Sequence, residues 1–271
     1  MTAISALLSV YHQTTPDELS NCLESIKNQS LQPVETVVVL DGPVNPDIYE
    51  ILDRFESDLK IRKVPVSRQR GLGPALRDGL EHCKGPLIAR ADTDDISVPE
   101  RFWWQHQFLE SNPEVRVLGG WLQEHDSSAP QRVSFIRRLP QTHEELVVFA
   151  RKRNPLNHPT VMFFKDTISD VGSYLDYRWF EDYHLWSRVL LAGHQIANLP
   201  QVLVEAKADS SYFARRGGWQ YALAESRFLG SLYKIGFLGP FECLIALLGR
   251  LPVRLLPVFV RRHFYRVLLR L

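Results

Sequence analysis

The chain has 271 residues, 45% of them hydrophobic and 23% charged, and its formal net charge at pH 7 is +1. This length and composition allow one large hydrophobic core or two modest ones. The near-neutral charge excludes the strong overall attraction to nucleic acid that a basic protein has, so we expect no nucleic acid partner. The three cysteines, Cys22, Cys83 and Cys243, are odd in number and lack metal-ligand spacing, which favours packing roles in a reducing compartment.

Strand-like and helix-like segments alternate through the first third of the chain. Apolar runs at 4–11, 33–40, 60–65 and 86–91 predict strands, and the segments at 18–28, 47–56 and 71–82 predict helices. This order is typical of a parallel sheet covered by helices, a Rossmann-like half. In such sheets ligands bind beyond the carboxyl ends of the strands, where Tyr11, Asp41 and the acidic run after residue 91 lie.

A glycine-rich stretch at 70–77 follows the third predicted strand and opens a helix. It is neither a G-x-G-x-x-G nor a Walker A sequence, which disfavours an ordinary dinucleotide site or P-loop. Its glycines are compatible with a phosphate at the helix N-terminus or with a plain tight turn. Arg77, one turn into the helix, is a candidate for binding a phosphate or carboxylate, or for a surface ion pair.

Three carboxylates, Asp92, Asp94 and Asp95, follow directly after the fourth predicted strand. Crowded carboxylates raise one another's pKa, and a shared cation relieves that repulsion. Mg²⁺ and Mn²⁺ bind one or two such carboxylates together with substrate phosphates, so the run predicts a metal-assisted enzyme of a phosphate-bearing substrate. An EF-hand loop is excluded, because Ser97 and Trp103 stand where it needs glycine and glutamate.

The acidic run also has a purely structural interpretation, in which Asp95 caps a helix that begins near Pro99. Ser97, with Glu100 three residues later, predicts that cap better, which leaves the acids needing another explanation. An aspartyl-phosphate phosphatase motif is disfavoured by Ile96 at its fifth position.

A second acidic pair, Glu181 and Asp182, is flanked by aromatic residues at the start of a predicted helix. Aromatic side chains suit the apolar faces of a sugar ring, and they raise the pKa of a carboxylate toward that of a useful base. The alternatives are an acid that satisfies the helix dipole and, for Trp186, simple core packing.

These segments resemble the family 2 glycosyltransferases, nucleotide-sugar-dependent enzymes with a GT-A fold, and particularly the bacterial members that assemble polysaccharides. The resemblance spans roughly residues 3–220 and rests on five motifs in order: Ser9-Val10-Tyr11-His12, Val39-Leu40-Asp41-Gly42, Arg70-Gly71-Leu72-Gly73, Ala89-Arg90-Ala91-Asp92-Thr93-Asp94-Asp95 and Phe180-Glu181-Asp182-Tyr183-His184-Leu185-Trp186. It implies an α/β fold with a Rossmann-like mixed sheet flanked by helices. The first motif departs slightly, with His12 where such enzymes often have asparagine.

The resemblance also implies roles for single residues. Asp41 would read the nucleotide base, Asp92 would contact the ribose or the surroundings of the metal, Asp94 would coordinate Mg²⁺ or Mn²⁺ on the diphosphate, and Asp182 would be the general base. The residues expected to bind the nucleotide sugar are Ser9, Tyr11, Asp41, Arg70, Arg77, Asp92 and Thr93.

An acceptor site is implied beside the donor site. The loop 154–159 holds Asn157 and His158 between two prolines and leads into a predicted strand at 160–164, and it looks like the acceptor-side loop of these transferases. Glu181 and Trp186 are the other acceptor candidates, although a lone histidine such as His158 is often structural. Arg215 and Arg216 lie in a loop that would close over the leaving group, or that is a solvated basic turn.

The C-terminal tail contains no acid after Glu242 and carries six arginines, Arg250, Arg254, Arg261, Arg262, Arg266 and Arg270. No uncharged apolar stretch in it reaches the ~18 residues of a spanning helix. The tail therefore favours an amphipathic helical segment on an anionic membrane surface, and the alternative is a helical pair that packs on the enzyme. Pro252 and Pro257 are expected to break any single long helix.

We accordingly expect a glycosyltransferase domain at 1–220, with a nucleotide-binding half at 1–96 and an acceptor half at 97–220, and a membrane-associated segment at 221–271. The start of the chain lacks a basic segment, and the apolar stretch 6–10 is too short for a signal peptide, so we expect a cytoplasmic protein, peripheral at the inner face of the cell membrane.

The expected reaction is inverting transfer from a nucleotide sugar, with a UDP-sugar favoured, to a hydroxyl of a glycan or lipid-linked glycan. Two alternatives remain. A metal-dependent nucleotidyltransferase uses similar carboxylates but places a glycine-rich loop after the first strand, where this chain has Tyr11-His12-Gln13-Thr14. The other is a catalytically silent membrane-associated scaffold of the same fold.

Overall fold

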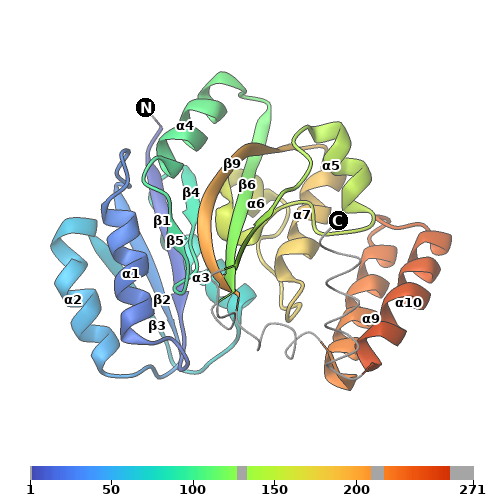
Figure 1. Ribbon diagram of the computed structural model, residues 1–271, viewed down its shortest axis with the longest axis horizontal. Coiled ribbons are helices and arrows are strands. Elements are labelled where there is room, and N and C mark those ends of the chain that lie inside the picture. Colours follow the sequence, from blue (N-terminus) through green and yellow to red (C-terminus); the bar gives the residue numbers. More distant parts are fainter. Residues whose placement is uncertain (1, 127–132, 209–216, 257–271) are drawn as a thin grey trace. The chain divides into compact units, whose positions relative to one another are not determined.

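The computed structural model describes residues 2–126, 133–208 and 217–256 (Figure 1). The chain divides into two compact units. The sheet unit comprises Met1–His125 and Ser134–Lys207, and the C-terminal unit comprises Asp126–Val133 and Ala208–Leu271.

A mixed sheet forms the centre of the sheet unit. Its strands are β1 (Ile4–Val10), β2 (Glu35–Asp41), β3 (Ile61–Val66), β4 (Leu87–Arg90), β5 (Ile96–Ser97), β6 (Val115–Asp126), β7 (Val133–Arg137), β8 (Met162–Phe164) and β9 (Gln195–Ala208). They follow the order β3-β2-β1-β4-β8-β6-β9-β5, with β7 paired to β6. The first four strands run parallel, whereas β8 is antiparallel to β4 and β6, and β5 to β9. Both the predicted parallel half and the expected mixed sheet are confirmed.

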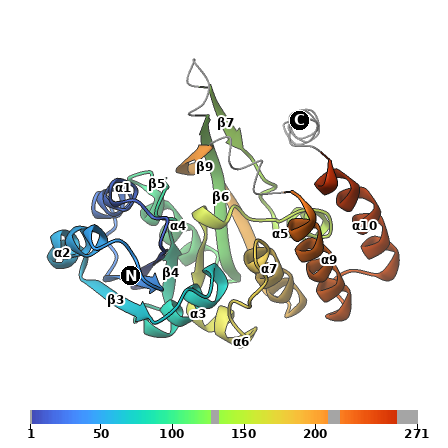
Figure 2. The same ribbon diagram turned by 90° about the horizontal axis from the view of Figure 1, so that it is seen from below.

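Helices cover both faces of the sheet. They are α1 (Pro16–Lys27), α2 (Asp47–Leu59), α3 (Leu72–His82), α4 (Arg101–Ser111), α5 (His143–Ala150), α6 (Lys165–Asp170) and α7 (Glu181–Leu191), and η1 (His158–Thr160) is a short 3-10 helix. One hydrophobic core contains side chains of α1, α2 and α4, and a second contains side chains of α3, α5, α6 and α7. Figure 2 shows α1 and α2 on the opposite side of the strands from α3 and α6.

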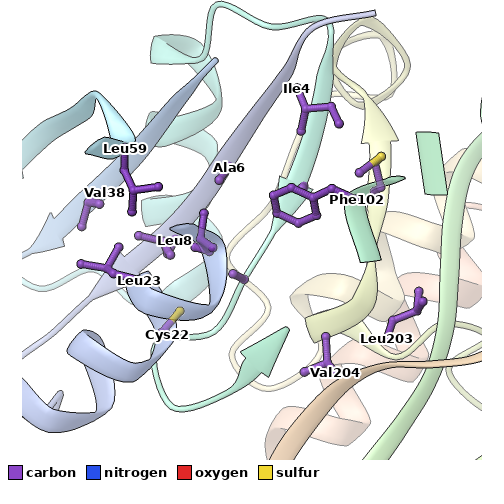
Figure 3. Close-up of a cluster of buried hydrophobic side chains, with 14 of the residues drawn as sticks. Ile4, Ala6, Leu8, Cys22, Leu23, Val38, Leu59, Phe102, Leu203 and Val204 are labelled. Carbon is purple, nitrogen blue, oxygen red and sulfur yellow. The ribbon is translucent and has the colours of Figure 1, made fainter. Parts of the chain in front are cut away.

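The alternation of β1 supplies both cores, because successive side chains of a strand point to opposite faces. Ala6 and Leu8 belong to the first core and Leu7 to the second, and all three are fully buried. Figure 3 draws part of the first core, where α1 contributes Cys22 and Leu23. All three cysteines are buried and unpaired, in agreement with the packing roles expected of them.

The start of α4 corrects one expectation. Ser97 does not cap this helix, because β5 pairs with β9 at Ser97 and the chain stays extended until Val98 donates its N–H to Leu203 at 3.0 Å. The N-cap is Glu100, which makes no side-chain cap hydrogen bond. The Ser97 hydroxyl instead accepts a hydrogen bond from Arg101 Nη1 at 2.9 Å.

Two helices dominate the described part of the C-terminal unit. They are α9 (Trp219–Lys234) and α10 (Pro240–Leu255), which pack against each other. Glu225 of α9 is fully buried and accepts hydrogen bonds from Arg254 Nε at 2.6 Å and from Arg250 Nη1 at 3.4 Å. The two α10 arginines therefore neutralise the buried carboxylate of α9. No helix in residues 2–126, 133–208 and 217–256 is long and apolar enough to cross a membrane.

The expected break at Pro252 is wrong, since this proline lies inside α10. A proline in a helix leaves the carbonyl four residues earlier without its partner. That residue is Leu248, which is 67% exposed, so water can reach this side of α10 and the helix tolerates the missing hydrogen bond. Pro257 lies outside the described residues.

Candidate active site

Acidic side chains gather just beyond the end of β4. Asp92, Asp94 and Asp95 each offer one carboxylate oxygen, and these oxygens all lie within 4.8 Å of one another. Asp94 is exposed and Asp92 half-buried, whereas Asp95 is 8% exposed. The three acids predicted from the sequence are therefore brought to one place, with Asp94 the most accessible to a ligand.

The three crowded carboxylates repel one another, and their burial makes the charged forms less stable. Burial raises the pKa of Asp95 well above its usual value, and Asp92 and Asp94 raise it further by repulsion. Loss of solvent around its carboxyl, followed by repulsion from Asp92, also raises the pKa of Asp94. A divalent cation would relieve this repulsion, and carboxylate oxygens are the ligands that Mg²⁺ and Mn²⁺ prefer, so the residues present fit such an ion.

Two buried arginines lie beside the acids, and sequence reasoning missed both. Arg90, the last residue of β4, forms an ion pair with both carboxylate oxygens of Asp92, with an Nη1 to Oδ2 distance of 2.5 Å. Arg101 is fully buried and donates to the main-chain carbonyl of Arg90 at 2.7 Å. Burial, followed by repulsion from Arg90, lowers the pKa of Arg101 to about 9. The available signal was an arginine two residues before an aspartate at a strand end.

Asp41 joins the end of β2 to the glycine-rich stretch. Its two carboxylate oxygens accept hydrogen bonds from the backbone N–H groups of Arg70 and Gly71, each at 2.8 Å. Gly71 has φ of 96°, a conformation that glycine adopts at little cost. Asp41 is 3% exposed, and its two hydrogen bonds hold this loop at the sheet edge.

The other expected donor residues lie along the same edge. Ser9 and Tyr11 are half-buried at the end of β1, and the Tyr11 backbone N–H donates to Thr14 Oγ1 at 3.2 Å. Thr93 is buried in the acidic loop. The remaining two lie on or next to α3: the Arg70 guanidinium forms an ion pair with Asp78, and Arg77 is half-buried.

The Glu181–Asp182 pair opens α7. The half-buried Asp182 accepts hydrogen bonds from Asn154 Nδ2 at 2.5 Å and from the Tyr183 backbone N–H at 2.7 Å. Glu181 is 9% exposed, and its Oε2 has no hydrogen-bond partner among the described residues. Burial, followed by repulsion from Asp182, raises the pKa of Glu181 to about 7.

Gly73 allows α3 to approach the segment before α7. A Cβ at this position would lie 2.6 Å from the Leu175 carbonyl oxygen and 3.3 Å from the Glu181 Cβ. Only a residue without a side chain therefore fits there. The glycine-rich stretch thus also supports the Glu181–Asp182 pair.

Three of the acceptor candidates, Asn157, His158 and Trp186, lie in the interior, so their contact with an acceptor stays a prediction. Trp186 is fully buried, and Asn157 donates to the Gly120 carbonyl at 2.8 Å. His158 lies 3.0 Å from the Tyr174 hydroxyl through Nε2, and burial, followed by repulsion from Arg90, lowers its pKa well below the usual value. Trp186 packs against the rings of His158 and Phe163.

Arg215 and Arg216, expected in a loop over the leaving group, lie outside the described residues.

Comparison with known proteins agrees with this arrangement. The Glycosyl transferase family 2 model matches residues 5–170. The chain is 38% identical over 261 residues to the amylovoran biosynthesis glycosyltransferase AmsE of Erwinia amylovora, covering 96% of this chain and 97% of that protein. It is 32% identical over 266 residues to the UDP-Gal:alpha-D-GlcNAc-diphosphoundecaprenol beta-1,3-galactosyltransferase of Escherichia coli, covering 98% and 96% respectively.

Among solved structures, the mannosyltransferase PcManGT of Pyrobaculum calidifontis, in complex with GDP-Man and Mn2+, matches with a TM-score of 0.65 at 15% identity, covering 98% of this chain and 76% of that one. Residues 1–349 of S. aureus TarS, in complex with UDP-GlcNAc, match with a TM-score of 0.65 at 15% identity, covering 99% and 76%. These likenesses agree with the expected GT-A fold. The chain belongs to glycosyl transferase family 2, and it is a glycosyltransferase.

Proposed function

We propose that this glycosyltransferase moves a sugar, with inversion of configuration, from a UDP-sugar to a hydroxyl of a glycan or lipid-linked glycan in polysaccharide assembly. The observation that carries the proposal is the pairing, in one unit, of an acid cluster suited to a metal-bound diphosphate with a separate carboxylate suited to deprotonate an acceptor. The Escherichia coli relative, which by its name uses UDP-Gal and a diphosphoundecaprenol acceptor, supports this choice of substrates.

The donor site is proposed at the carboxyl ends of β1, β2 and β4. Asp94, with Asp92 beside it, would hold Mg²⁺ or Mn²⁺, which neutralises the diphosphate leaving group when bound. Asp41 fixes the Arg70–Gly71 backbone that would border the nucleotide, and Ser9, Tyr11, Arg77 and Thr93 would complete the site. The mannosyltransferase bound to GDP-Man and Mn2+ supports a divalent cation in this fold.

Asp182 is proposed as the general base. Its carboxylate would take the proton of the acceptor hydroxyl while the oxygen attacks the anomeric carbon from the face opposite the leaving nucleotide. The hydrogen bonds from Asn154 and from the Tyr183 backbone fix the direction of this carboxylate. Because a single displacement inverts the anomeric carbon, the product would have the opposite configuration to the donor.

The C-terminal unit is proposed to lie on the anionic inner face of the cell membrane. One side of α10 exposes four large apolar residues, Phe241, Leu244, Ile245 and Leu248, at helical spacing. Arg250 and Arg254 are occupied by Glu225, so attraction to anionic lipid would come from the four arginines of residues 257–271. An apolar stripe beside basic residues is typical of a helix in the plane of the headgroups.

The experiment that tests the function is incubation of the purified chain with a panel of nucleotide sugars, Mn²⁺ and a diphosphoundecaprenol-linked sugar. Release of nucleoside diphosphate with growth of the acceptor glycan is expected. Release of pyrophosphate in a parallel incubation with nucleoside triphosphates and sugar 1-phosphates would indicate the nucleotidyltransferase alternative instead. Neither product with any donor would indicate a silent scaffold and would contradict the proposal.

A further inference from the structure

Arg90 is a buried cation in direct contact with Asp92, one of the acids of the proposed donor site. This arginine is 1% exposed, and its guanidinium forms an ion pair with both carboxylate oxygens of Asp92. Its main chain is held as well, since its N–H donates to Val161 at 3.1 Å and its carbonyl accepts from Arg101 at 2.7 Å. A two-point contact between a fork-shaped guanidinium and a carboxylate fixes the direction of the carboxylate as well as its charge.

The same side chain also acts on the Glu181–Asp182 side. Arg90 shares a strand face with Ile88, which belongs to the second core together with Tyr174 and Trp186. From there its charge lowers the pKa of Glu181, against the larger effects of burial and of Asp182, and it disfavours protonation of His158. Arg90 is therefore coupled to a donor aspartate, to the residue beside the base, and to the buried histidine.

Arg90 Nε and Glu181 Oε2 are among the buried polar atoms that have no hydrogen-bond partner within the described residues. A buried polar atom without a partner is destabilising, so each one calls for an explanation. Arg101 lies next to Arg90, but its hydrogen bonds go to main-chain carbonyls, to Ser97 and to Gln105, and to no carboxylate.

We propose that Arg90 is a positioning residue for transfer: its two-point contact orients the Asp92 carboxylate toward the metal-bound diphosphate. This inference rests on the proposed function. Two contributions of Arg90 can be separated, because orienting the Asp92 carboxylate needs two N–H donors, whereas balancing its negative charge needs only a positive charge. A lysine at position 90 would keep the charge and lose the fork, and a methionine would lose both.

The test compares Arg90→Lys and Arg90→Met with wild type in two assays: the binding of UDP in the presence of MnCl₂ by calorimetry, and the turnover of sugar transfer. For Arg90→Met, we expect the Kd for UDP to rise by about tenfold or more and kcat to fall by about 10–100-fold, the usual range when a partner of a metal-binding residue is removed. For Arg90→Lys, the Kd should rise similarly while kcat recovers to within about tenfold of wild type.

The control is Arg116→Met. Arg116 pairs with Asp166 and lies over the Phe164 ring. Phe164 is in register with Leu87 at the start of β4, so this arginine is at the edge opposite the acids. We expect wild-type Kd and kcat from this variant.

Arg90 variants that match Arg116→Met in both assays would overturn the inference. If Arg90→Met does not fold, Arg90→Lys decides alone, and an unchanged Kd for UDP would then reject the orienting role. Absence of transfer by the wild-type chain would instead count against the proposed function.

Discussion

Glu181 and Asp182 are adjacent in sequence, yet their carboxyl groups meet different surroundings. Asp182 accepts hydrogen bonds from Asn154 and from a backbone N–H at the start of α7, donors that suit an ionised carboxylate. Glu181 is buried, and its pKa of about 7 keeps it protonated in part at neutral pH. The two neighbouring carboxyls thereby differ in charge at neutral pH, which suits Asp182 to the role of general base proposed for it.

The pKa of Glu181 predicts an unusual dependence of stability on pH. A carboxyl with a raised pKa binds its proton more tightly in the folded state than in the unfolded state. The free energy of unfolding therefore falls as the pH rises from 4.5, the ordinary pKa of a glutamate, to about 7, the pKa of Glu181 in the folded protein. Glutamine cannot ionise, so Glu181→Gln should gain roughly 1–3 kcal/mol over wild type between about pH 4.5 and pH 8. Urea unfolding of both proteins across this range measures it.

The matched control is Glu114→Gln, which changes an exposed glutamate outside the site. It should leave the slope of stability against pH close to that of wild type. A Glu181→Gln variant with an unaltered slope would show that burial does not keep this carboxyl protonated.

The crowded acids make a second prediction at the residue scale. If Asp94 holds the cation, Asp94→Asn should remove most turnover while the fold survives, because the exposed side chain keeps its shape and loses only charge. Relief of the repulsion with Asp95 should leave the melting temperature equal to or above that of wild type. Circular dichroism follows the melting, and EDTA treatment of the wild type should mimic the loss of turnover. Full activity in EDTA would remove the metal from the mechanism.

At the scale of elements, β4 is the strand on which the site depends. It is only four residues long, Leu87–Arg90, and all four are buried between β1 and β8. Its end delivers Arg90 and then the three acids into the edge where β1 and β2 also end. Because the strand is held on both sides, the position of the acidic loop is set by the sheet.

The α10 helix carries the element-scale prediction. If its apolar stripe lies in the headgroups, Ile245→Glu with Leu248→Glu should abolish sedimentation of the full chain with phosphatidylglycerol vesicles, because it places two charges among lipid tails. Both side chains are more than half exposed, so the fold should survive. High salt should weaken the wild-type binding by screening the arginines.

A single added charge elsewhere in the same unit is the control. Gln220→Glu changes an exposed position of α9 that is outside the stripe, and this variant should still sediment with the vesicles. Equal binding by the double variant and the wild type would reject the membrane surface proposed for α10.

Across the whole molecule, the sequence predicted what depends on neighbours along the chain. Apolar runs predicted β1 to β4. The acids after β4 were predicted to gather because strand ends share an edge. These features need no knowledge of which distant segments meet.

Features that depend on distant segments were missed or wrongly expected. The burial of His158 and Trp186 follows from the packing of α7 against η1 and β8, which no local pattern encodes. Ser97 was expected as a helix cap because the local sequence does not show that it pairs with Val204 of β9, far along the chain. The pairing of Arg90 with Asp92 likewise depends on the interior behind β4.

The stereochemistry of the product tests the central claim most directly. With the donor and acceptor found in the panel, NMR of the wild-type product should show the anomeric configuration opposite to that of the donor. Asp182→Asn should lower kcat by roughly 10²–10⁴-fold with the affinity for UDP nearly unchanged, whereas Asp170→Asn on the exposed surface of α6 should match wild type. Retention of configuration, or near-native kcat in Asp182→Asn, would contradict the single-displacement mechanism and its base.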